Sequence, residues 1–233
     1  MFLSRLSTVL RSARMVGAEA TTGAPSGGTR ELLLDTAERL FAERGINGVS
    51  LREIGLAANQ RNNGVTQYHF GDKAGLVRAV FERRAAAVND RRLQLLRDAA
   101  QEGSESVTDL VRAFVEPLGE QVRPGNWYVP FLSRLQAEHQ RDELLQSVRN
   151  DVNTGFDRVA RQLRRDHFAS MPRVVFVTRL RLAVNLAIDA LADHQARFAQ
   201  GEERILPLPL FVDDLVDGIS GLLTAPRSHP ELR

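Results

Sequence analysis

Residues 50–76 read SLREIGLAANQRNNGVTQYHFGDKAGL and concentrate polar side chains of the types that bind nucleic acid bases. Asn and Gln can bind an adenine edge with two hydrogen bonds, Arg can do the same with guanine, and a Thr methyl can touch a thymine methyl. The alternative is a polar turn on the surface of an ordinary helical domain. The candidates for base contacts are Arg61, Asn62, Asn63, Thr66 and Gln67, and those for phosphate contacts are Ser50, Arg52, Tyr68, His69 and Lys73.

These side chains need short helices to position them, and the local sequence predicts such helices. Apolar residues at helical spacing predict a first helix from Thr29, which can cap it, to Gly45. Ser50 and Glu53 form a capping-box pattern that starts a second helix through about residue 58. A third helix is predicted over 63–68, and Asp72 is placed to cap a fourth. Two short helices joined by a turn indicate a helix-turn-helix, whose second helix lies in the DNA major groove.

Helical periodicity continues to about residue 223, and no strand alternation interrupts it. The chain is therefore predicted to be all-α, with an N-terminal three-helix DNA-binding unit and a larger C-terminal helical domain. The expected divisions are a flexible basic tail at 1–28, the helix-turn-helix domain at 29–73, an effector-binding and dimerisation domain at 74–225, and a tail at 226–233. The later helices are predicted at 105–121, 127–137, 141–167, 173–200 and 212–223.

The composition excludes much chemistry. There is no cysteine, none of the five histidines has a Glu three residues before it, and no G-x-S-x-G motif is present. We therefore expect no enzyme activity, no metal site and no cofactor. No apolar run reaches the length of about 18 residues that a membrane helix needs, and a cytoplasmic location is expected.

The first residues, MFLSRLSTVLRSARMVG, permit three interpretations. Their Ser/Arg-rich composition without acidic residues can resemble a transit peptide. A flexible basic arm, or translation that begins at Met15, fits the same sequence.

Charge is unevenly distributed along the chain. The 233 residues carry 31 basic and 29 acidic side chains, but residues 1–92 hold 14 basic and 9 acidic ones, whereas the remainder holds 17 and 20. Clustered charge sets the local potential more than total charge does. The N-terminal part is therefore the part expected to contact a polyanion.

The motif as a whole resembles the helix-turn-helix of the tetracycline-repressor (TetR) family. The resemblance rests on a Ser at the start of the second helix, an Ile-Gly-Leu-Ala-Ala core, a Gly-Val pair, a Tyr-His-Phe end and Lys-x-x-Leu into the fourth helix. The turn NQRNNGV is one residue longer than the family's commonest spacing, and Gln67 replaces the usual first aromatic. The resemblance implies that Ser50, Tyr68 and Lys73 contact phosphate and that Phe70 belongs to the core.

The resemblance also implies a homodimeric repressor that binds a palindromic double-stranded DNA operator and is released by a small-molecule effector. Dimerisation has a physical reason as well, because one short helix reads few bases and a two-fold dimer doubles the contacts. The candidate dimer seam consists of Leu182, Leu186, Ala190, Phe211, Leu215 and Leu222. The candidate effector pocket consists of Phe114, Trp127, Tyr128, Phe131, Arg134, His139, Phe156, His167, Asn185 and Asp189, with an acidic or carbonyl group of the ligand facing Arg134.

Two other classes of function are compatible with the residues. One is a helical enzyme or metal carrier that uses the histidines of the C-terminal domain. The other is an architectural DNA-binding protein without an effector. Bound metal in untagged protein would favour the first, and the absence of any small molecule that changes operator affinity would favour the second.

Overall fold

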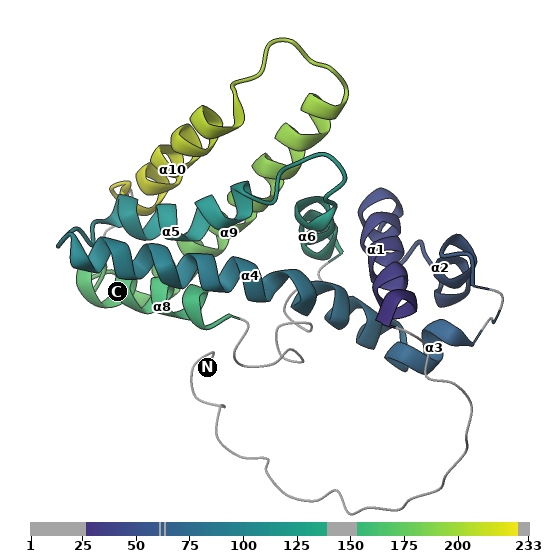
Figure 1. The fold of residues 1–233 in the computed structure, drawn as a ribbon. Helices are drawn as coiled ribbons and strands as arrows, with labels where there is room; N and C mark the ends of the chain where they lie inside the picture. Colours follow the sequence, from purple (N-terminus) through teal and green to yellow (C-terminus); the bar gives the residue numbers. More distant parts are fainter. Residues whose placement is uncertain (1–26, 61, 63, 139–152, 228–233) are drawn as a thin grey trace, which may run out of the picture.

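The structure, a computed structural model, describes residues 27–60, 62, 64–138 and 153–227, and over these residues the chain is helical without strands (Figure 1). This architecture confirms the predicted all-α class. The elements are α1 Gly27–Arg44, α2 Leu51–Ala57, α3 Val65–Phe70, α4 Lys73–Gln101, α5 Val107–Gly119, α6 Tyr128–Ala137, α8 Thr154–Gln162, the π-helical turn η1 Leu163–His167, α9 Arg173–Ala199 and α10 Leu208–Thr224.

Local capping signals set the starts of two helices as predicted. The Ser50 hydroxyl accepts a hydrogen bond from the Glu53 backbone N–H at 3.2 Å, and the Glu53 carboxylate accepts one from the Ser50 N–H at 2.8 Å. Asp72 accepts a bond from the Gly75 N–H at 2.7 Å and caps α4. The Ser50 hydroxyl and backbone hold the pKa of the Glu53 carboxyl below its ordinary value.

Several predicted boundaries were wrong; the last helix, for example, begins at Leu208, four residues before its predicted start. Thr29 does not cap the first helix, because α1 already begins at Gly27. The third helix begins at Val65 and ends at Phe70, two residues later than predicted at each end. The Asn62 side chain accepts a hydrogen bond from the Gly64 N–H at 2.9 Å, so this part of the turn is stabilised outside the helix.

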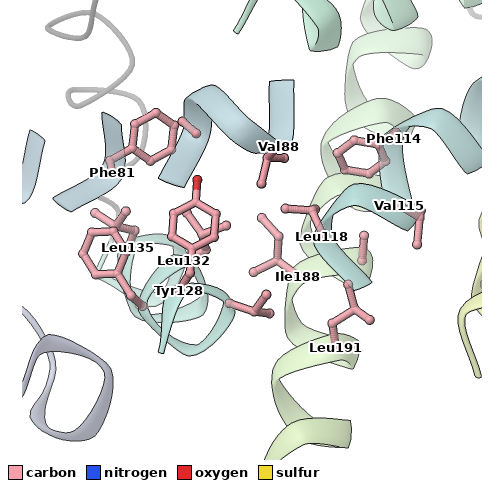
Figure 2. Close-up of a cluster of buried hydrophobic side chains, with 14 of the residues drawn as sticks. Phe81, Val88, Phe114, Val115, Leu118, Tyr128, Leu132, Leu135, Ile188 and Leu191 are labelled. Atoms are coloured by element: carbon pink, nitrogen blue, oxygen red, sulfur yellow. The ribbon is translucent and has the colours of Figure 1, made fainter. Parts of the chain in front are cut away.

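The helix α4 crosses the predicted boundary between the two units without a break. Its first turns pack on α1 and α3, and its later turns pack on α5 and α8 (Figure 1). The helices α9 and α10 pack on each other and on α5, while α6 lies between α1 and α9. Side chains of α4, α5, α6 and α9 meet in the core shown in Figure 2, which includes Phe81, Phe114, Tyr128 and Leu191.

Two acidic side chains tie α1 to the rest of the molecule. Glu38 of α1 is 2% exposed and accepts hydrogen bonds from Arg83 at 2.6 Å, from Arg84 at 3.1 Å and from the Trp127 N–H at 3.3 Å. Glu138, at the end of α6, accepts bonds from the N–H groups of Ile46 at 2.7 Å and Asn47 at 2.9 Å in the turn after α1. Because these groups join segments about 50 to 90 residues apart, they fix the N-terminal helices against α4 and α6.

None of the helices over the described ranges has the length and apolarity required to cross a bilayer. Within the same ranges, no three His, Asp or Glu side chains gather in a way that could hold a metal ion.

Candidate nucleic-acid interface

The turn between α2 and α3 depends on an Asn in the left-handed backbone region. Asn59 follows the C-cap of α2 with φ of 55° and donates its N–H to the carbonyl of Leu56 at 3.0 Å. Asn tolerates this conformation better than any residue except glycine. The Gln60 N–H then bonds the Gly55 carbonyl at 2.9 Å and closes the end of α2. The turn thereby redirects the chain so that α3 packs on α2 and on α4.

The outer side of α2 and α3 presents several of the predicted contact residues. Arg52, Asn62 and Gln67 are exposed, and Tyr68 is 76% exposed. Leu56, which the sequence analysis did not select, is 56% exposed on the same unit.

The predicted phosphate contacts Ser50 and Lys73 lie at the starts of α2 and α4. Ser50 is exposed although its hydroxyl takes part in the capping box. Lys73 is partly buried, and its ammonium group donates to the Asn47 carbonyl at 3.5 Å. Both helix starts are therefore held in place by local bonds before any partner binds.

Thr66 is oriented differently from the sequence prediction, and His69 packs against neighbouring rings. Thr66 is 0% exposed, and its hydroxyl lies 3.2 Å from the position that a Cβ on Gly55 would occupy. Thr66 therefore packs α3 on α2, and the prediction of a base contact by Thr66 was wrong. His69 is partly buried between the rings of Tyr68 and Phe70, at centroid distances of 5.4 and 5.9 Å. Arg61 and Asn63 lie outside the described residues.

The buried Thr66 hydroxyl has no hydrogen-bond partner among the described residues. Replacing Thr66 by Val keeps the shape and removes this unsatisfied group, so we expect the free energy of unfolding to rise by about 1 kcal/mol. Urea titration monitored by circular dichroism measures this change. DNA sequence preference should stay as in the wild type; a changed preference would mean that Thr66 does reach the bases.

The aromatic residues predicted to line an effector pocket are instead largely core. Phe131 is 0% exposed and stacks on Phe41 of α1 at 6.2 Å, so it packs α6 on α1. Tyr128 is 2% exposed, and burial raises the pKa of its phenol. Phe114 is buried and contacts the partly buried Phe156 at 5.5 Å.

The polar members of the predicted pocket do not converge. Arg134 is exposed and donates to the Ala42 carbonyl at 3.1 Å, and Asp189 accepts a bond from Ser133 at 2.8 Å. His167 contacts the Glu105 carbonyl at 2.6 Å at the far end of α8. The contact of Arg134 with a ligand therefore stays a prediction, and its exposed position places it outside the core. Asn185 is partly buried on α9, and His139 lies outside the described residues.

Two surface hollows are found among the described residues. One, of about 470 Å³, is lined by Glu105, Arg158, Arg161, Gln162 and Arg165. The other, of about 310 Å³, includes Trp127, the only member of the predicted pocket in either hollow. Glu38 and its partner Arg84 also line this second hollow.

Sequence reasoning missed Arg92, the most deeply buried cation of the described helices. It lies on α4, is 5% exposed, and is placed next to Phe114. Helical periodicity could have placed it on the inward face, four residues after the buried Val88 and four before the buried Leu96.

The predicted dimer seam divides into two parts. Leu182 and Leu186 of α9 are 51% and 40% exposed. Leu215 is buried, Phe211 packs its ring 4.4 Å from that of His194, and Ala190 and Leu222 pack partly buried on the core. The α10 members of the seam thus contribute to the core of this chain. Large apolar side chains left exposed on α9, α10 and the segment between them are Val174, Val177, Leu182, Leu186, Phe198, Leu206 and Leu210.

Residues 33–80, which span most of α1 through the start of α4, match the model of the bacterial regulatory proteins of the tetR family. This part of the chain is therefore similar to the DNA-binding part of tetR-family regulators. The fold is also that of NalD from Pseudomonas aeruginosa, the secondary repressor of the MexAB-OprM multidrug efflux pump, with a TM-score of 0.53, 19% identity, and coverage of 84% of this chain and 96% of NalD.

A second TetR-like neighbour is the fatty acid degradation regulator FadR from Bacillus halodurans. It has a TM-score of 0.50, 16% identity, and coverage of 88% of this chain and 99% of FadR. No curated protein sequence matches the chain. The match over residues 33–80 supports the predicted class of DNA-binding transcriptional regulator.

Proposed function

We propose that this protein is a TetR-family repressor that binds a palindromic operator as a homodimer in the cytoplasm and is released by a small-molecule effector. The observation that carries the proposal is the exposed polar and aromatic surface of α2 and α3, held by capping bonds on both sides. NalD, described as a repressor, has the same fold. The exposed apolar side chains of α9 and α10 supply a surface for the second copy.

Within this interface, side chains have two roles. Tyr68, near the end of α3, and Lys73, at the start of α4, bind phosphate groups of the DNA. These contacts position the protein but do not distinguish one base sequence from another. Gln67, exposed on α3, reads a base edge in the major groove. Arg52 on α2 adds a contact to the neighbouring phosphates.

The proposed function is tested by incubating the purified protein with random DNA fragments and sequencing those it retains. We expect a two-fold symmetric site with half-sites spaced by about one helical turn. Retention of fragments without a shared sequence would contradict the repressor and favour an architectural protein.

Replacing both Tyr68 and Lys73 by Ala should weaken binding to all sequences and reduce the salt slope of the affinity by about 1 for each lost phosphate contact.

Replacing Gln67 by Ala should instead change the preferred base, at a cost of about 1–3 kcal/mol in discrimination. Gel-shift titrations at several salt concentrations measure both effects. Arg161→Ala, which removes an exposed positive charge on α8, serves as the control and should bind like the wild type. Unchanged operator binding by the double variant would show that α3 is not the reading helix.

A further inference from the structure

The guanidinium of Arg92 is buried among the helices and, over the described residues, has no carboxylate partner. It is 5% exposed, its Nε has no hydrogen-bond partner, and its Nη2 donates a long hydrogen bond of 3.4 Å to the Phe114 carbonyl, the one bond that it makes with a described residue. No salt bridge to Arg92 exists among the described residues. Burial lowers the pKa of this group to about 10. A buried charge without a partner is costly, so it is retained only where something compensates for it.

The surroundings of Arg92 are aromatic. The guanidinium carbon lies 5.6 Å from the centre of the Phe114 ring, and that ring lies 5.5 Å from the ring of Phe156. Interaction with the ring face offsets only part of the cost of desolvation. Since Phe156 is only partly buried, this cluster of rings leads from Arg92 towards the surface at the first turn of α8.

The backbone next to Arg92 is adapted to it. A Cβ on Gly155 would lie 3.2 Å from the Arg92 Cδ and 3.1 Å from the Asn89 Oδ1, so a larger residue would crowd both side chains. Asn89 accepts a hydrogen bond from the Gly155 N–H at 2.7 Å and joins α4 to the start of α8. The junction thus holds the guanidinium in place without neutralising its charge.

A second polar group shares this interior. The Tyr128 side chain is 2% exposed, and burial raises the pKa of its phenol although the charge of Arg92 opposes this shift. Its oxygen points toward α4, among the apolar side chains of the core (Figure 2). A phenol and a guanidinium both donate hydrogen bonds, and an anion can accept from the two together.

We infer that the effector of this protein is an organic anion, with a carboxylate bound by Arg92 and Tyr128 and an apolar body packed on Phe114 and Phe156. Arg binds a carboxylate through two parallel N–H bonds, which would satisfy the unpartnered Nε. A mostly apolar site with a few placed polar groups is the usual composition of a small-molecule pocket. This inference rests on the proposed function in that it takes the ligand of this site to be the effector.

The test compares acids with uncharged amides of the same shape. Decanoate with decanamide, and 4-phenylbutyrate with 4-phenylbutanamide, are titrated into the full-length protein, and binding is measured by thermal shift and calorimetry. We expect at least one acid to raise the melting temperature more than its amide. Arg92→Met should weaken binding of that acid at least about 30-fold, as expected for loss of one partner of a buried charge pair, and leave the amide unaffected.

The control variant is Arg91→Met, which removes the same charge one residue earlier. Arg91 is partly exposed and pairs with Glu116 at 2.7 Å and Glu120 at 2.8 Å, so the acid should bind this variant as it binds the wild type. Without probe, Arg92→Met should be as stable as the wild type or more stable, because it removes an unpaired buried charge. If Arg92→Met does not fold, Tyr128→Phe is the second test variant. It should weaken binding of the acid and leave binding of the amide unchanged.

Two results would overturn the inference: both acids act like their amides on the wild type, or Arg92→Met keeps the wild-type preference for the acid. Gel shifts with the selected operator are run separately. Acid binding through Arg92 without DNA release would leave the site intact and contradict the effector role. Failure to bind any operator would contradict the proposed function and leave the binding measurements unaffected.

Discussion

Replacing Glu38 by Ala is expected to lower the free energy of unfolding by about 3–5 kcal/mol, as found when one partner of a buried ion pair is removed. Glu38 is 2% exposed and receives the Arg83 Nη2 at 2.6 Å and the Arg84 Nε at 3.1 Å. Burial by itself lowers the pKa of the Arg83 guanidinium, but Glu38 and Asp35 together more than offset this and the pKa lies above its ordinary value. Without Glu38, the Trp127 N–H would also lose its acceptor.

Urea unfolding of Glu38→Ala and of a matched control on the same helix measures this effect. The control, Glu43→Ala, removes an exposed carboxylate that pairs with Arg39 at 3.1 Å one turn away, and should cost less than about 1 kcal/mol. Glu38→Gln separates charge from volume and should fall between the two. Equal losses for Glu38→Ala and Glu43→Ala would show that the Glu38 network does not hold α1 in place.

Replacing Leu182 and Leu186 together by Glu is expected to convert the protein to a monomer and to weaken operator binding by about 100-fold or more, because the two reading units then bind separately. Both leucines are exposed on α9 in the single chain, so the substitutions should leave the fold of each copy intact. A dimer would bury this apolar surface, and two charges per copy would oppose that burial.

Sedimentation velocity reports the mass of each variant. The wild type should sediment at twice the chain mass of 25.9 kDa and the double variant at that mass. Leu32→Glu is the control, since Leu32 is 45% exposed on α1, away from α9 and α10. A double variant that is still dimeric would mean that the second copy binds another face.

Two capping signals confined to a few residues were read correctly from the sequence, whereas most features that depend on distant residues were not. The Ser50–Glu53 capping box and the Asp72 cap each need only three or four consecutive residues, and both helix starts were predicted. The start of α3 was misplaced because Asn62 can serve a helix or a turn equally well, and here its side chain bonds the Gly64 N–H.

The candidate site was predicted in part for the same reason. Residue type alone made Thr66 a base-reading candidate, but the packing of α3 on Gly55 decides that it faces inward. Arg134 and Arg92 have the same chemistry, and only the tertiary structure shows that the first is exposed and the second buried. The class of function could be predicted from the family resemblance, because that resemblance rests on the spacing of several residues within 50–76.

The continuity of α4 gives this helix the geometry of a lever. Lys73 lies at its first turn beside α3, and Arg92 lies nineteen residues later on the same rigid rod, a distance of about 28 Å at the usual helical rise. A tilt of about 5° about Arg92 would therefore move the start of α4 by about 2.5 Å. In a two-fold dimer the displacement doubles to about 5 Å, against a half-site spacing of about 34 Å. A small shift of Arg92 around a bound anion would thus displace the two reading helices far enough that they no longer fit successive major grooves together.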